Sequence, residues 1–107
     1  MTWMVTVKES VIDDLRWLGR TQGRLVLKEA SKRLTANPIA ETRNMKTLRP
    51  NPVAQRELRL SGKYRLLFNV DAPNRLVTIV LVGEKRGDSL IVQGKEFTAH
   101  HESGSAE

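Results

Sequence analysis

The segment ELRLSGKYRLLFNVD (residues 57–71) constrains the fold of this chain most strongly, because it combines two strand-like runs with a turn signal. In residues 55–60 and 64–71, apolar and polar side chains alternate or residue types that favour strands predominate. Ser61-Gly62-Lys63 separates the two runs and supplies a glycine for a left-handed backbone position. We therefore predict an antiparallel hairpin in the middle of the chain.

The length of the turn decides which side chains face one another across this hairpin. A two-residue turn would place Leu60 opposite Arg65 and would mix apolar and charged side chains on one face. A three-residue loop instead gives one mostly apolar face, with the opposed pairs Leu60 and Tyr64, Leu58 and Leu66, and Arg56 and Phe68. On the other face, Arg59 then lies opposite Arg65, and Glu57 lies opposite Leu67.

The predicted pair of Arg59 and Arg65 is unfavourable unless an anion joins it. Like charges directly opposite on neighbouring strands destabilise a sheet by a few tenths to about 1 kcal/mol. Two guanidinium groups suit a phosphate, because each donates several hydrogen bonds in one plane. The simpler interpretation is that both side chains extend into water. We predict a phosphate site with Arg65 as its first member, and for Arg59 and Arg56 both interpretations stay open.

Two helices are predicted before the hairpin and further strands on either side. Residues 2–7 alternate and predict a first strand, with Trp3, Val5 and Val7 on one face. Ser10 precedes apolar residues at helical spacing that predict a helix as far as Gly19, and a second helix is predicted over residues 21–37. Residues 38–53 hold three of the four prolines and predict a loop, and residues 76–85 predict the third strand of a meander. SLIVQG could add a short edge strand.

These elements predict an α+β fold. A small antiparallel sheet, made of a meander of three to four strands plus the N-terminal strand, packs against the N-terminal helical hairpin. At 107 residues the chain has room for one core, so we expect a single domain over residues 1–99 and a flexible tail over residues 100–107. With no cysteine and no long apolar run, we expect a soluble cytoplasmic protein without a membrane anchor.

The net charge of +6 is concentrated in one part of the chain. Residues 42–65 carry seven basic side chains and one acidic side chain, and this surplus equals that of the whole chain. A cluster of this kind attracts phosphates, although it is also compatible with an ordinary solvated face. Candidate RNA-binding residues are Lys46, Arg49, Arg56, Lys63 and Lys85. A second row recurs every fourth residue along the helices, and we interpret it as a solvated face that could contact RNA or an acidic partner: Arg16, Arg20, Arg24, Lys28 and Lys32.

Few residues could transfer a proton at such a site. Glu57 is the carboxylate within the basic segment and could act as a general base or form a plain salt bridge. Tyr64 and Lys63 are further candidates, as are His100 and His101 if the tail folds back. The sequence contains no recognisable metal-binding constellation, so we expect no metal and no cofactor.

The order of these elements, together with ELRLSGKYRLLFNVD and IVLVGEKRGDSL, resembles the RelE/ParE superfamily of bacterial toxins. The resemblance spans most of the chain and includes a Tyr-Arg-Leu at the start of a strand and a late Gly-x-Lys-Arg. It implies a toxin of a type II toxin-antitoxin system. Such a toxin would be a ribosome-dependent mRNA endonuclease that uses the RNA 2′-hydroxyl without a metal and is neutralised by a cognate antitoxin in a hetero-oligomer.

The resemblance also implies roles for individual residues. Arg65 matches the family's arginine after tyrosine, and Arg86 matches the arginine of the Gly-Lys-Arg segment. Together with Arg59, Glu57 and Tyr64 they form the predicted catalytic set, which would bind the scissile phosphate of mRNA on the ribosome, with contacts to rRNA expected nearby.

The chain departs from the family after its last predicted strand. Ribonucleases of this group carry a tyrosine or histidine there, and SLIVQG has neither. The proton-transfer residue is therefore unassigned. Two other functions stay open for this reason: a ParE-type toxin that inhibits DNA gyrase without cutting RNA, and a nucleic-acid-binding module without toxicity.

Overall fold

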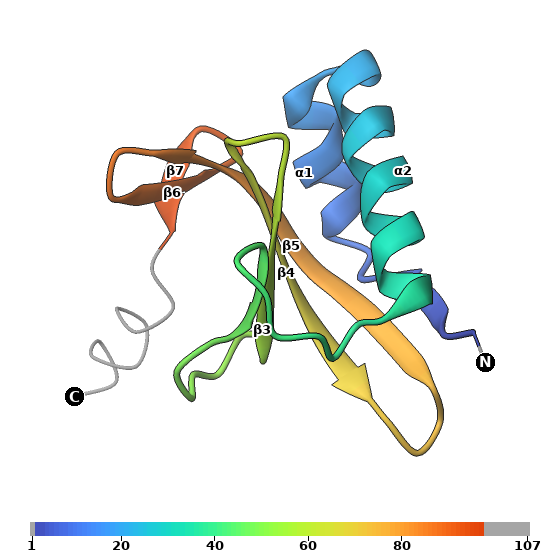
Figure 1. Cartoon of the computed structure of the whole chain (residues 1–107). Coiled ribbons are helices and arrows are strands. Elements are labelled where there is room, and N and C mark those ends of the chain that lie inside the picture. The colour runs from blue at the N-terminus through green and yellow to red at the C-terminus, as the bar shows by residue number, and fades with distance from the viewer. Residues whose placement is uncertain (1, 98–107) are drawn as a thin grey trace.

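The computed structural model describes residues 2–97, which form two helices and seven strands (Figure 1). In chain order the elements are β1 (Met4–Val7), α1 (Val11–Leu18), α2 (Arg20–Ala36), β2 (Met45–Thr47), β3 (Arg56–Leu60), β4 (Tyr64–Asp71), β5 (Leu76–Arg86), β6 (Ser89–Val92) and β7 (Lys95–Phe97). The α+β class is confirmed, and so are both helices and the three-strand meander. No helix in the described part of the chain is long and apolar enough to cross a membrane.

All seven strands belong to one sheet. The strands β2 to β7 are neighbours in sequence order and run antiparallel, whereas β1 pairs with β5 in parallel. β1 covers only Leu76 to Ile79 of β5, and β6 pairs with the other end of β5 from Glu84 onward. The middle of β5 is therefore unpaired along that edge. The parallel strand was not distinguished in the sequence, since alternation does not reveal strand direction.

The predicted register of the central hairpin is confirmed. Arg59 is paired with Arg65, Glu57 with Leu67, and Leu60 with Tyr64. The loop between the strands has positive φ angles at Ser61 (47°) and Gly62 (76°). A three-residue loop with these left-handed positions places one set of side chains on each face of the hairpin, as the spacing predicts.

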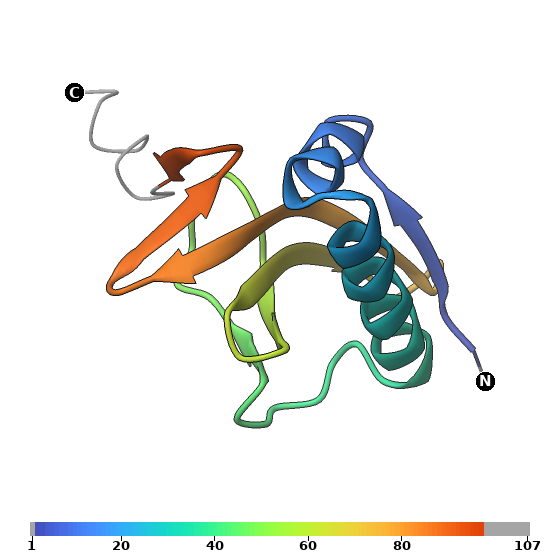
Figure 2. The ribbon, with the colours of Figure 1, turned by 90° about the horizontal axis from the view of Figure 1, so that it is seen from above.

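The two faces of the sheet are covered differently, and Figure 2 shows both helices on the same side. On the face that we call the helix face, α1 and α2 pack Val11, Val26, Ala30 and Leu34 into the main core. A smaller cluster on the opposite face, which we call the open face, is centred on three buried residues: Ala54, Leu67 and Leu81. These two clusters explain why β5 is apolar on both sides.

Two strands were missing from the sequence-based prediction. β2 lies within the predicted loop and is only three residues long, too short to show a period. β7 follows a two-residue turn in which Gln93 (φ 52°) and Gly94 (φ 78°) are both left-handed. The predicted tail at residues 100–107, including His100 and His101, lies outside the described residues.

Candidate functional site

Arg65 and Arg59 lie side by side on the open face of the central hairpin. The Nη1 atom of Arg65 donates hydrogen bonds to Gly62 O (2.9 Å) and Tyr64 O (3.0 Å), which tie the side chain to the turn. Within residues 2–97 its Nε and Nη2 atoms form no hydrogen bond. Arg65 is thus held in place at only 9% exposure while some of its donors stay available.

The guanidinium group of Arg59 has fewer hydrogen-bond partners than that of Arg65. Its side chain is 39% exposed and forms no hydrogen bond in the described part of the chain, and its Nε atom is buried without a partner. The nearest carboxylate oxygen, Glu57 Oε1, lies 4.0 Å from this nitrogen, which is too far for a hydrogen bond. The buried Nε atom of Arg56 also lacks a partner, so this feature is common to both arginines of β3. Arg59 differs because its other guanidinium nitrogens form no hydrogen bond within residues 2–97 either, which leaves donors for an anion.

Glu57 lies among cations on the same face. Its Oε1 atom is 3.8 Å from Lys46 Nζ on β2, and its side chain is 15% exposed. Lys46 and Arg59 therefore share one carboxylate, while Arg65 has no carboxylate partner within residues 2–97. The three cations exceed the single carboxylate by two charges, which preserves the basic character that the sequence predicts for this segment.

A pocket of about 370 Å³ opens next to these charges on the open face. Its lining is mostly apolar, with Arg49 and Glu57 as the charged members, and comprises Leu48, Arg49, Pro50, Asn51, Glu57, Leu67, Leu90 and Phe97. We call it the open-face pocket. Phe97 comes from β7, which pairs with β6 and brings the ring opposite Leu90. An apolar pocket with one aromatic ring beside a cationic row can hold a nucleotide base next to its phosphate.

The position of Phe97 was not predicted, although a signal for it was present. Gln93-Gly94 is a turn sequence between two short strands, and it implies a last strand beyond SLIVQG. A Cβ atom at Gly83 would lie only 2.6 Å from Ile91 O, so glycine permits β6 to approach β5 closely at the level of Arg65. An aromatic side chain thus follows one strand later, although it is a phenylalanine and not the tyrosine or histidine of the family pattern.

Asp14 is a second residue whose place was not predicted. Asp14 lies in the first turn of α1, where the helix dipole favours a carboxylate. In the structure it is 5% exposed, and it accepts hydrogen bonds from Val82 N (3.0 Å) and from Gln93 Nε2 (2.6 Å). The first bond satisfies an amide at the unpaired edge of β5, and the second fixes the turn before β7. Asp14 thus helps to position Phe97.

Lys63 and Arg86 form a separate group around Glu84 at the end of β5, whereas Lys85 faces the other side of the strand. Glu84 is 3.8 Å from Lys63 Nζ and accepts a 3.2 Å hydrogen bond from Arg86 Nε. Lys85 alternates with these residues along β5 and lies opposite Leu90, on the open face. Arg86 is thus engaged with Glu84 and does not join the pair of Arg59 and Arg65.

Tyr64 is also separated from the arginine pair. Adjacent residues on a strand point to opposite faces, so Tyr64 and Arg65 diverge. The ring of Tyr64 is buried in the main core, and its hydroxyl lies 3.5 Å from Gln22 Oε1 on α2. The structure therefore places the predicted catalytic tyrosine under the helices.

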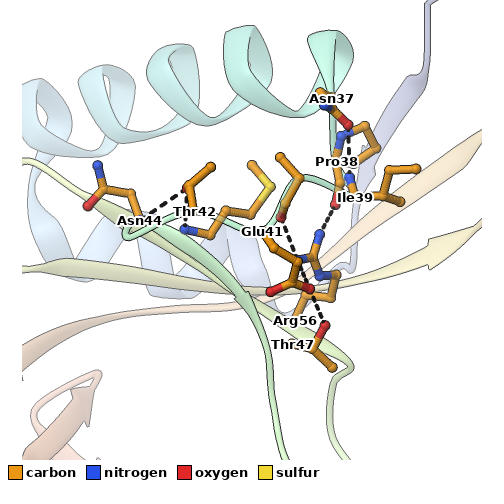
Figure 3. Close-up of polar contacts among 10 residues, drawn as sticks. Asn37, Pro38, Ile39, Glu41, Thr42, Asn44, Thr47 and Arg56 are labelled. Carbon is orange, nitrogen blue, oxygen red and sulfur yellow. Dashed lines mark hydrogen bonds and ion pairs between the residues drawn. The ribbon is translucent and has the colours of Figure 1, made fainter.

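Arg56 occupies the helix face and is only 6% exposed, and Figure 3 shows its guanidinium reaching the segment that follows α2. It donates hydrogen bonds to Pro38 O (2.5 Å), Ala40 O (2.6 Å) and Glu41 Oε2 (2.8 Å). Its carbon centre also lies 5.9 Å from the ring centre of Phe68. The predicted RNA-binding arginine on this strand is thus enclosed by the protein and fixes the chain that leaves α2.

Glu41 completes this arrangement from the surface. The Thr47 hydroxyl donates a 2.7 Å hydrogen bond to Glu41 Oε2. This bond is the main cause that holds the pKa of Glu41 below its ordinary value, and the charge of Arg56 acts in the same direction. Glu41 thereby connects the segment after α2 with β2.

Comparisons with known proteins agree with this architecture. No family model matches the chain, and no curated protein sequence matches it. Among solved structures, the toxin-antitoxin complex RelBE2 from Mycobacterium tuberculosis is 26% identical with a TM-score of 0.68, covering 79% of this chain and 93% of that chain. A mutant of the E. coli toxin RelE in the free state is 26% identical with a TM-score of 0.62, covering 82% and 88%.

The archaeal RelE-RelB complex from Pyrococcus horikoshii shares the fold at 22% identity, with a TM-score of 0.63 and coverage of 83% of this chain and 100% of that chain. The α+β architecture, with two helices and a mostly antiparallel sheet, is thus also the fold of bacterial and archaeal RelE structures. By its architecture this chain is a RelE-like protein.

Proposed function

We propose that this chain is the toxin of a type II toxin-antitoxin pair and that it cleaves messenger RNA on the ribosome through the open face of its sheet. The observation that carries this proposal is the pairing of Arg59 with Arg65 beside the open-face pocket. The similarity to RelE toxins and RelB-RelE complexes supports the toxin assignment and the antitoxin partner.

In the proposed reaction, the RNA 2′-oxygen attacks the adjacent phosphorus while the bond to the 5′-oxygen of the next nucleotide breaks. Arg59 and Arg65 hold the phosphate and stabilise the negative charge that grows on it in the transition state. The guanidinium nitrogens of Arg59 and Arg65 that form no hydrogen bond within residues 2–97 support this role. A base from one side of the scissile bond packs in the open-face pocket against Phe97.

Glu57 and Lys46 are the proposed proton-transfer pair. Glu57 accepts the proton of the 2′-hydroxyl, and Lys46 donates a proton to the departing 5′-oxygen. Their placement supports this assignment, because Lys46 Nζ and Glu57 Oε1 lie 3.8 Å apart on the same face as the arginine pair. Arg49, which lines the pocket, and Lys85 contribute phosphate contacts on either side.

Purified protein added to ribosomes that carry a defined mRNA tests this function. Wild type should cut the mRNA, whereas Arg59→Ala and Arg65→Ala should reduce the cleavage rate by about 100-fold each. Arg33→Ala is the matched control, because Arg33 lies on α2 and pairs with Glu29 at 3.3 Å. Intact mRNA with the wild-type protein would refute the nuclease, and inhibited supercoiling by gyrase under those conditions would favour a ParE-type toxin.

A further inference from the structure

A second pocket lies beside the open-face pocket on the same side of the sheet. Its volume is about 430 Å³, and its lining includes Lys8, Ser10, Val53, Val80, Leu81 and Phe97. We call it the Lys8 pocket. The volume lies within the range of about 300–1,000 Å³ that small-ligand sites occupy. Apart from Phe97, the reaction proposed above uses none of these residues.

The floors of the two pockets are neighbours in the sheet. Leu67 lines the open-face pocket and Leu81 lines the Lys8 pocket, and these two leucines are paired across β4 and β5. Neighbouring strands lie about 4.8 Å apart, so consecutive nucleotides of one RNA strand can reach both floors. Leu67 is also paired with Glu57, which connects this row of side chains to the proposed reaction centre.

Phe97 forms the boundary between the two pockets, because it lines both of them. The turn before its strand is held from α1, since Gln93 Nε2 donates a 2.6 Å hydrogen bond to Asp14. A Cβ atom at Gly94 would lie 2.7 Å from Trp17 Cζ2, so the indole ring lies directly against that glycine. The boundary is therefore fixed before RNA binds, which lowers the entropic cost of ordering it.

The segment between β1 and α1 adds two polar groups to the apolar lining of the Lys8 pocket. Lys8 is exposed and forms no ion pair within residues 2–97. Ser10 precedes α1, but its hydroxyl forms no capping hydrogen bond. An ammonium group suits a phosphate, and a hydroxyl can donate to or accept from the edge of a base. These contacts are the ones that a nucleotide requires.

We propose that the Lys8 pocket binds the nucleotide on the other side of the scissile bond, an inference that rests on the nuclease function proposed above. Phe97 then separates two consecutive bases of the mRNA, with one base in each pocket. Lys8 contacts a phosphate beside the second base, and Val80 and Leu81 pack against that base. A nucleotide is favoured over a peptide because the pocket continues the proposed RNA site across a shared aromatic ring.

Separation of the two bases also affects the reaction. Bases held on either side of a ring cannot stack on each other, so the backbone between them is extended. An extended backbone helps to bring the attacking 2′-oxygen into line with the departing 5′-oxygen. Loss of the Lys8 contact should therefore weaken binding alone, whereas loss of the Phe97 ring should weaken binding and lower the maximal cleavage rate.

The experiment uses ribosomes that carry a defined mRNA with 2-aminopurine on one side or the other of the bond that wild type cuts. A 2′-deoxynucleotide at that bond prevents cleavage, and stacking on an aromatic ring quenches 2-aminopurine fluorescence. Wild type should quench both positions, and Phe97→Leu should quench both less. Lys8→Ala should raise the half-saturating protein concentration about fivefold, and Lys8→Arg should restore it. Arg33→Ala on α2 is the control that removes one positive charge elsewhere.

Cleavage of the unmodified mRNA is measured with the same proteins. Lys8→Ala should keep its maximal rate within twofold of wild type, and Phe97→Leu should lower it. Quenching at only one position, with normal cleavage by wild type, would overturn the second pocket and leave the nuclease intact. Equal weakening by Lys8→Ala and Arg33→Ala would indicate general charge attraction and would also overturn it. No cleavage by wild type would refute the nuclease and this inference together. Unchanged quenching by Lys8→Ala, with weaker antitoxin binding, would assign the pocket to a protein partner instead.

Discussion

The arginines on the two faces of the central hairpin differ in their hydrogen-bond partners. Arg56 on the helix face and Arg65 on the open face are almost equally buried, at 6% and 9% exposure. Arg56 donates three hydrogen bonds to the segment after α2, whereas Arg65 uses one nitrogen for the turn, and Arg59 beside it forms no side-chain hydrogen bond in the described residues. At similar exposure the two buried arginines thus differ in their partners, because Arg56 joins β3 to a distant segment whereas Arg65 contacts only carbonyl groups of its own hairpin.

Leu66 and Leu67 are neighbours on β4 whose side chains point to opposite faces of the sheet, so their substitution compares the stability that each face provides. Leu66 is fully buried in the main core, and Leu67 belongs to the smaller open-face cluster. Leu66→Ala should lower the free energy of unfolding by about 4 kcal/mol, and Leu67→Ala by about 2 kcal/mol. Urea denaturation of both variants measures the difference. Equal losses would mean that the two faces contribute alike to stability.

Arg65→Ala tests the open face directly. We expect cleavage of ribosome-bound mRNA to fall about 100-fold, which corresponds to about 2.7 kcal/mol of transition-state stabilisation. The free energy of unfolding should fall by about 1 kcal/mol, because one lost hydrogen bond joins the side chain to Gly62 O in the turn and only Tyr64 O is left as a buried acceptor without this partner. Single-turnover cleavage and thermal unfolding on the same preparation separate the two effects. A large loss of stability would assign Arg65 a structural role like that of Arg56.

Arg56→Met should do the opposite of Arg65→Ala: it should lower stability and leave cleavage almost unchanged. This change removes the partners of Pro38 O and Ala40 O, so the free energy of unfolding should fall by about 2 kcal/mol. Cleavage per folded molecule should stay within twofold of wild type, because Arg56 faces away from the proposed site. Denaturation and the ribosome assay at low temperature measure both quantities. A severe loss of cleavage in fully folded protein would contradict the division between the faces.

The smallest expected effect concerns pH. The hydrogen bond from Thr47 holds the pKa of Glu41 below its ordinary value of 4.5. A carboxyl whose pKa is lower in the folded state stabilises the protein above its unfolded pKa, and this contribution is lost as the pH falls through the folded pKa. Wild type should therefore exceed Glu41→Gln slightly in melting temperature at pH 7, and the two should converge below pH 4.5. A constant difference across this range would show that the charge of Glu41 is not responsible.

Local patterns were sufficient for much of the fold. The turn at Ser61-Gly62-Lys63 and the alternation around it fixed the register of β3 and β4, because a one-residue shift would have exchanged the two faces. The helices were also predictable from apolar spacing and from Pro38. β2 and β7 were missed because three-residue strands carry almost no periodic signal and are held by their neighbours.

The candidate site was only partly predictable from the sequence. The opposition of Arg59 and Arg65 followed from register, but the burial of Arg56 depends on Pro38, Ala40 and Glu41, which lie 15 to 18 residues away. Phe97 reaches the open-face pocket through the β6–β7 hairpin, whose turn is fixed by Asp14 from 79 residues earlier in the chain.

The sequence by itself thus determined which side chains share a face of the central hairpin, because alternation and turn length are local properties of the backbone. Only the tertiary structure decided which arginine donates to three acceptors of a distant segment and which keeps donors without a partner among the described residues. That choice depends on carbonyl and carboxylate acceptors brought from distant segments, and their positions are set when the helices pack on one side of the sheet.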